Sequence, residues 1–92
     1  MYIQLKNEII DVSKFVMVKK CNSSKDCDGW VFPEEDDKSR ILFIVANKSD
    51  RNILLEFPDD LLANSVLEKI IEHLGQSDVV LDCSKHDIRL YY

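Results

Sequence analysis

Glycine and proline are scarce in this chain, and their scarcity limits both disorder and chemistry. Only two glycines and two prolines occur among 92 residues, so long flexible linkers are not expected. Two glycines are also too few for the glycine-rich loops that hold phosphates or dinucleotides, and no G-x-S-x-G motif is present. The sequence therefore predicts a protein that is not an enzyme.

Positive charge is also in short supply. Twelve lysines and arginines face 17 acidic residues, which gives a net charge of −5. Nucleic-acid binding needs clustered basic residues, and anionic membranes attract basic segments. The opening MYIQLKNEIID lacks the layout of a signal peptide, and no apolar run approaches the length of a membrane span. We expect a cytoplasmic protein with neither nucleic acid nor a membrane as partner.

The three cysteines cannot all pair within one chain, and we interpret them as reduced thiols. Cys21, Cys27, Cys83 and His86 are all permitted zinc ligands, and Cys83-x-x-His86 has a plausible ligand spacing. The five residues between Cys21 and Cys27 make a looser pair than usual zinc knuckles have. The sequence predicts no metal and no cofactor. A small metal-dependent protein or enzyme that uses these four residues is the alternative.

One helix is well defined by its start, its apolar face and its stop. In FPDDLLANSVLEKIIEHLG, Pro58 ends the preceding strand, Asp59 or Asp60 caps the first turn, and Gly75 follows the last turn. We expect the helix over about residues 59–74, with a broad apolar stripe that packs on a sheet. The stripe consists of Leu62, Ala63, Val66, Leu67, Ile70, Ile71 and Leu74.

Short apolar segments on both sides of the helix predict strands. The continuously apolar segment Ile41–Ala46 is typical of a strand that is covered on both faces. Short polar connections between successive segments favour antiparallel pairing, because a parallel crossover needs about a dozen residues. The other expected strands are Tyr2–Leu5, Ile9–Val12, Phe15–Val18, Asn52–Phe57, Val79–Leu81 and Ile88–Tyr92, with a short one at Trp30–Phe32.

These elements predict a single α+β domain over residues 1–92. Its antiparallel, curved meander sheet is covered by the helix at about 59–74 and ends in a short β tail. The order YIQLKNEIIDVSKFVMV, RILFIVANKSDRNILLEF and then a helix resembles small bacterial pleckstrin-homology-like domains. The resemblance implies a partly open barrel with a helix at one end. It carries over no binding residues, because the first hairpin turn offers only Lys6 beside Glu8.

The apolar cluster Trp30, Val31 and Phe32 is the candidate partner-binding site, with Tyr91 and Tyr92 as further members. One interpretation is a loop that folds back to complete the core. The other is an aromatic anchor for a partner, since buried tryptophan often dominates interfaces. The predicted function is a binding or assembly module that acts through protein–protein contacts. A homodimer or other homo-oligomer is expected through this patch or an unprotected sheet edge.

Overall fold

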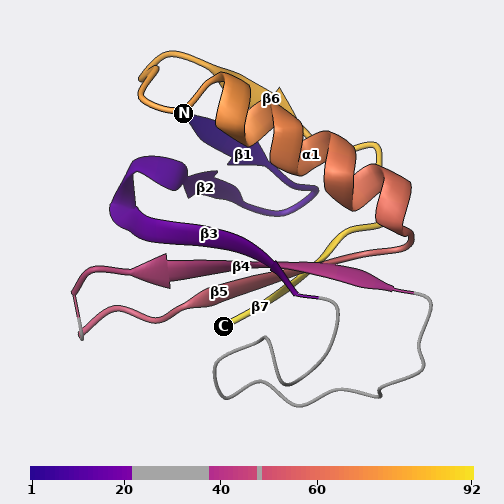
Figure 1. Cartoon of the computed structure of the whole chain (residues 1–92), viewed down its shortest axis with the longest axis horizontal. Coiled ribbons are helices and arrows are strands. Elements are labelled where there is room, and N and C mark those ends of the chain that lie inside the picture. The colour runs from indigo at the N-terminus through magenta and orange to yellow at the C-terminus, as the bar shows by residue number, and fades with distance from the viewer. Residues whose placement is uncertain (22–37, 48) are drawn as a thin grey trace.

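The computed structural model describes residues 1–21, 38–47 and 49–92. Within these ranges it contains strands, one 3₁₀ turn (η1) and one α-helix, so the predicted α+β class is confirmed (Figure 1). In chain order the elements are β1 (Tyr2–Gln4), β2 (Ile9–Asp11), η1 (Val12–Lys14), β3 (Phe15–Cys21), β4 (Ser39–Val45), β5 (Ile53–Phe57), α1 (Asp60–Glu72), β6 (Val80–Asp82) and β7 (Arg89–Tyr91).

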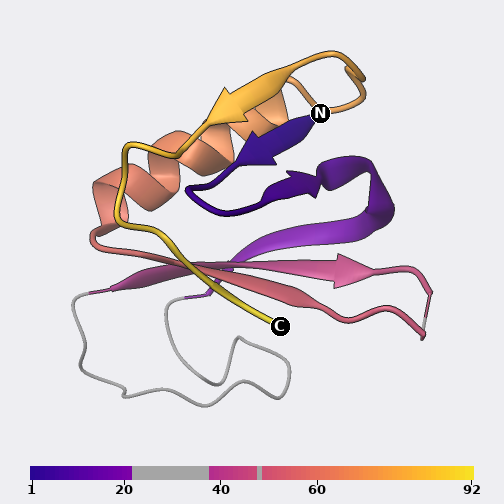
Figure 2. The same ribbon diagram turned by 180° about the vertical axis from the view of Figure 1, so that it is seen from behind.

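The described strands form two sheets that do not close into a barrel. The larger sheet has the order β3-β4-β5-β7 and is antiparallel throughout. The smaller sheet has the order β2-β1-β6, in which β1 and β2 form the predicted hairpin and β6 runs parallel to β1. This parallel pairing is possible because β1 and β6 are separated by most of the chain. Helix α1 and the smaller sheet lie on the same side of the larger sheet (Figures 1 and 2).

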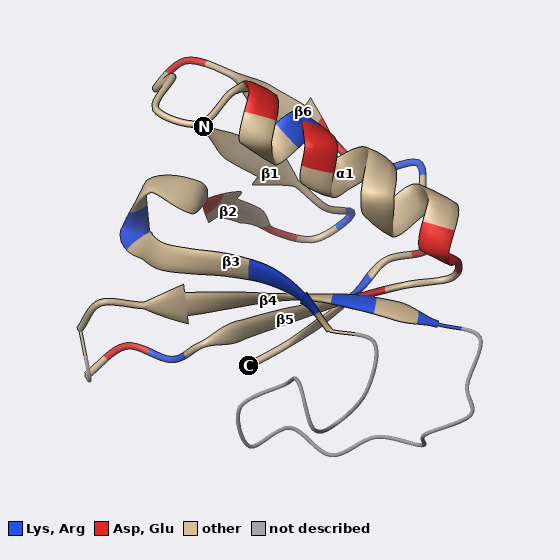
Figure 3. Ribbon diagram, viewed as in Figure 1, with Lys and Arg blue, Asp and Glu red and all other residues tan. Residues whose placement is uncertain are grey.

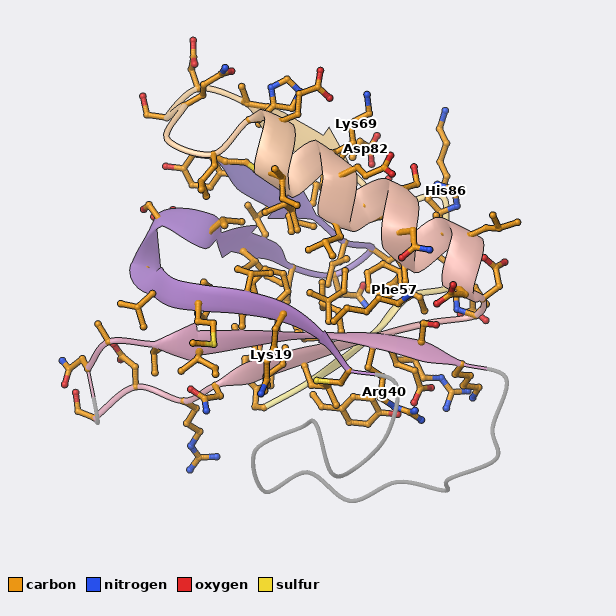
Figure 4. The ribbon with its side chains drawn as sticks, in the orientation of Figure 1. Lys19, Arg40, Phe57, Lys69, Asp82 and His86 are labelled. Carbon is orange, nitrogen blue, oxygen red and sulfur yellow. The ribbon has the colours of Figure 1, made fainter. Side chains whose placement is uncertain are left out.

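The central strand β4 is buried on both of its faces, as its apolar sequence predicts. Ile41 and Phe43 belong to the main core between the larger sheet, α1 and the smaller sheet. Leu42 points the other way and packs in a second cluster with Cys21 and Leu54. Figure 4 shows the same division, with Phe57 on the α1 side of the sheet and Arg40 on the opposite side. The larger sheet therefore separates two layers of buried side chains.

Helix α1 begins and ends where local chemistry allows. The Asp59 side chain accepts a hydrogen bond from the Leu62 amide at 2.7 Å, which is an N-cap contact. Gly75, just after the helix, has a φ of +89°, a conformation that favours glycine. Ala63, Val66 and Ile70 are buried in the main core. Among the described residues, no helix is both long enough and apolar enough to cross a membrane.

The apolar stripe of α1 is wider than the surface that buries it. Leu62 and Leu67 are half-buried, but Ile71 is 66% exposed and Leu74 is 69% exposed. The expectation that the whole stripe packs on the sheet is therefore wrong at Ile71 and Leu74. Ile71 lies about 100° around the helix from the buried Ile70, and Leu74 lies beyond the end of α1, after the C-cap His73. Both border the side of α1 that faces β3.

Candidate functional site: an apolar groove between α1 and β3

An apolar groove runs between α1 and the first half of β3, and we name it the α1–β3 groove. It contains a cavity of about 250 Å³. A second cavity of about 320 Å³, whose lining includes the polar Ser13, Gln76 and Ser77, adjoins it, because Val12, Phe15 and Leu74 line both. All nine residues that line the 250 Å³ cavity are apolar. They are Leu67, Ile70, Ile71 and Leu74 from α1 and the turn after it, and Val12, Phe15, Val16, Met17 and Val18 from η1 and β3.

The strand wall of the groove contains a β-bulge. Phe15 pairs with Val45 and Met17 pairs with Ile44, so Val16 has no partner in the β3–β4 register. Among the described strands, β3 pairs with β4 alone and forms one edge of the larger sheet. The bulge increases the local twist of this edge, which opposes the addition of a further strand. It also leaves Val16 68% exposed and Met17 51% exposed at the rim of the groove.

Polar contacts tie the first turn of α1 to the sheet beyond one end of the groove. The Lys20 ammonium of β3 contacts the Asp60 carboxylate and donates to the Asn64 side-chain oxygen at 2.8 Å. The Ser39 hydroxyl of β4 donates to the same carboxylate at 2.9 Å. Hydrogen bonds from Lys20 and Ser39 lower the pKa of Asp60, because they favour its charged form. These contacts hold α1 against β3 and β4 at one end, while the 250 Å³ cavity beyond them is lined by apolar residues alone.

The two walls of the groove differ in charge, as Figure 3 shows along β3 and α1. Residues 12–21, which form η1 and β3, contain three lysines, and the N-cap of η1 is the acidic Asp11. Residues 59–74, which form α1 and its caps, contain four acidic residues and one lysine. The strand wall is therefore basic and the helix wall acidic, although their facing side chains are apolar.

The site predicted from the sequence lies elsewhere. Trp30, Val31 and Phe32 fall outside the described residues. Tyr91 is on β7, at the other edge of the larger sheet from β3. Tyr92 is 58% exposed, and its hydroxyl donates to the Glu8 carboxylate beside the β1–β2 turn. Neither tyrosine lines the α1–β3 groove.

The described members of the alternative metal set do not come together. Cys21 belongs to the second cluster and Cys83 to the main core, on opposite faces of the larger sheet. His86 is exposed, and Cys27 lies outside the described residues. Within residues 1–21, 38–47 and 49–92 no three His, Cys, Asp or Glu side chains are placed to hold a metal ion.

The expectation of reduced thiols is wrong for Cys21, which is disulfide-bonded, whereas Cys83 is a free thiol. The sequence gives no direct signal for this bond, because spacing alone does not decide between a thiol and a disulfide. The expected cytoplasmic location stays a prediction.

Cys83 is expected to resist thiol reagents in the folded protein. Burial and the neighbouring Asp82 raise its pKa to about 11, so almost no thiolate is present at pH 8. An Ellman assay at pH 8 should detect this thiol only after denaturant is added. Because its pKa is raised on folding, protonated Cys83 favours the folded state. Its contribution to the free energy of unfolding is present in full below about pH 9 and is lost as the pH rises toward 11. Rapid labelling of the native protein would contradict this burial.

Apolar residues that line the groove can be recognised in the sequence, but the sequence pattern alone does not show that they lie together. The stripe of α1 includes Ile71 and Leu74 beside the three positions that the core uses, and Val16 and Met17 are adjacent apolar residues on one strand. Only the placement of β3 beside α1 shows that these residues border the same hollow.

Comparison of the chain with protein-family models, with curated proteins and with solved structures finds no match in any of the three.

Proposed function

We propose that this protein is a binding module whose α1–β3 groove receives the apolar side chains of a protein partner. One observation carries the proposal: Val16, Met17, Ile71 and Leu74 are each more than half exposed and line one cavity whose residues are all apolar. Clustered exposed apolar side chains commonly mark interaction surfaces. Full burial of each would contribute about 1.5–3 kcal/mol.

The lining of the groove favours a protein partner over a small molecule. Small-molecule sites combine apolar walls with a few convergent polar groups that fix orientation. The 250 Å³ cavity of the groove has no polar side chain among its nine lining residues. The bulge at Val16 also disfavours a peptide that adds as a strand, because such a peptide needs a regular edge of backbone donors and acceptors. Side-chain packing, as of an amphipathic helix in a groove, is the mode that fits.

A displayed library of random peptides tests the proposal directly. Selection on the purified chain should enrich peptides with apolar residues at helical spacing. Their binding should be lost in the variant Ile71→Asp, which places a charge in the helix wall. The matched control is Leu61→Asp, because Leu61 is 83% exposed on the same helix and lies outside the groove.

The comparison between the two variants decides the outcome. Peptides that bind the original chain and Leu61→Asp equally, but not Ile71→Asp, support the groove as the binding site. A library that yields no binder, or binders that Ile71→Asp retains, would contradict the proposal. Circular dichroism of both variants checks that neither substitution unfolds the chain.

A further inference from the structure

We infer that the partner in the α1–β3 groove is a second copy of this chain, related to the first by a two-fold axis. In this dimer α1 of each copy lies against β3 of the other. The inference rests on the proposed function and adds the identity and orientation of the partner. Two-fold homodimers are the commonest closed assemblies, and their interface uses the same surface on both copies.

The groove has the two unlike walls that such an interface needs. One wall is α1 with the turn after it, which carry the exposed Ile71 and Leu74. The other is a strand edge whose Val16 and Met17 are exposed at the bulge. A two-fold axis through the groove places the helix wall of one copy opposite the strand wall of the other. The exposed apolar side chains of both walls are then covered together, twice per dimer.

The charges of the two walls complement each other in this arrangement. The strand wall with the N-cap of η1 has three lysines and one acid, Asp11, and the helix wall with its caps has four acids and one lysine. Lys20 already contacts Asp60 within its own chain, so it does not determine which partner binds in the groove. Lys14 and Glu68 are exposed, one directly before β3 and the other on the turn of α1 between Leu67 and Ile71. The two-fold brings these opposite charges to the same rim and disfavours a copy bound in the reverse sense.

A partner other than a second copy would need its own apolar and charged pattern to match. This chain supplies that pattern itself, because its helix is acidic beside exposed Ile71 and its strand is basic beside exposed Val16. The bulge favours side-chain packing over edge-to-edge pairing of two β3 strands. The contact is therefore closed and isologous, which predicts a dimer and no longer assembly.

Sedimentation equilibrium over a wide concentration range tests the dimer. We expect the average mass to rise from one chain to two and to stop there. Ile71→Asp and Val16→Asp, one on each wall, should each raise the dimer dissociation constant at least about 30-fold, as for an interface hot spot. Leu61→Asp should leave it within about threefold, which is a tenth of that effect. A chain that stays monomeric at millimolar concentration would overturn the inference, and so would a dimer that tolerates both groove variants.

Charge reversal tests the orientation. Lys14→Glu and Glu68→Lys should each weaken the dimer, and the two changes together in one chain should restore most of the loss. The single effects should shrink in 1 M salt, because exposed charges are screened. Single changes without effect, or a double variant weaker than either single one, would overturn the two-fold arrangement.

The peptide selection separates this inference from the proposed function. If the chain is monomeric but library peptides bind the groove and fail on Ile71→Asp, the second copy is excluded as partner while the binding function holds. If neither the dimer nor peptide binding depends on Ile71, both proposals fail.

Discussion

Replacement of Ile70 with alanine is expected to lower the free energy of unfolding by about 2–5 kcal/mol, and the same replacement at Ile71 by less than about 0.5 kcal/mol. The two isoleucines are neighbours on α1 and share one helix propensity, so the comparison isolates burial. Ile70 is 2% exposed in the main core, whereas Ile71 is 66% exposed. Ile70→Ala both removes buried apolar surface and leaves a cavity in the main core.

Urea denaturation monitored by circular dichroism measures both losses. The protein should be dilute enough to be monomeric, since association stabilises the folded state by mass action and would add a contribution at Ile71. Equal losses at the two positions would contradict the orientation of α1 on the sheet. A loss at Ile71 that appears only at high protein concentration would instead report burial in an interface between copies.

Much of the fold could be predicted from the sequence where local chemistry decides it. Asp59 caps α1, and Gly75 has the positive φ that its place after the last turn predicts. The continuous apolar segment of β4 is covered on both faces because Ile41 and Leu42 pack in different clusters. In each case the deciding interaction lies within a few residues or follows from apolar periodicity alone.

The features that the sequence did not predict depend on contacts between distant segments. The parallel pairing of β6 with β1 joins Leu81 to Ile3, and no local pattern marks it. The exposure of Ile71 and Leu74 follows from where β3 lies, not from the helix sequence. The same is true of the candidate site, because the α1–β3 groove exists only after its two walls have been brought together.

Replacement of Glu56 with glutamine is expected to lower the free energy of unfolding by about 3 kcal/mol, at the lower end of the cost of breaking a buried ion pair. The Arg40 guanidinium donates to the Glu56 carboxylate at 3.0 Å, and the two residues are only 3% and 7% exposed. The Lys38 ammonium, which is closer to solvent, lies 3.2 Å from the same carboxylate. The amide of glutamine can still accept a hydrogen bond, but it cannot balance the charge of the buried guanidinium.

Glu72→Gln is the matched control on α1. Glu72 pairs with Lys69 at 3.7 Å, and both side chains are more than half exposed. Glu72→Gln should therefore lower the free energy of unfolding by less than about 0.5 kcal/mol, and the effect should shrink with added salt. The loss at Glu56 should persist in 1 M salt, because solvent ions do not screen a buried pair. A Glu56 effect as small and as salt-sensitive as that at Glu72 would show that the pair is hydrated.

The size of the Glu56 effect also bears on how the larger sheet keeps its register. Arg40 and Glu56 are directly opposite each other across β4 and β5, and Phe43 and Ile53 are opposite each other further along the same ladder. A slip of one residue would turn Glu56 toward the main core and away from Arg40. The ion pair therefore opposes such a slip. Glu56→Gln should weaken the preference for the native register of β4 and β5 as well as lower the free energy of unfolding. Faster amide hydrogen exchange along β5 in Glu56→Gln than in Glu72→Gln is the expected result, and uniform exchange in the two variants would contradict it.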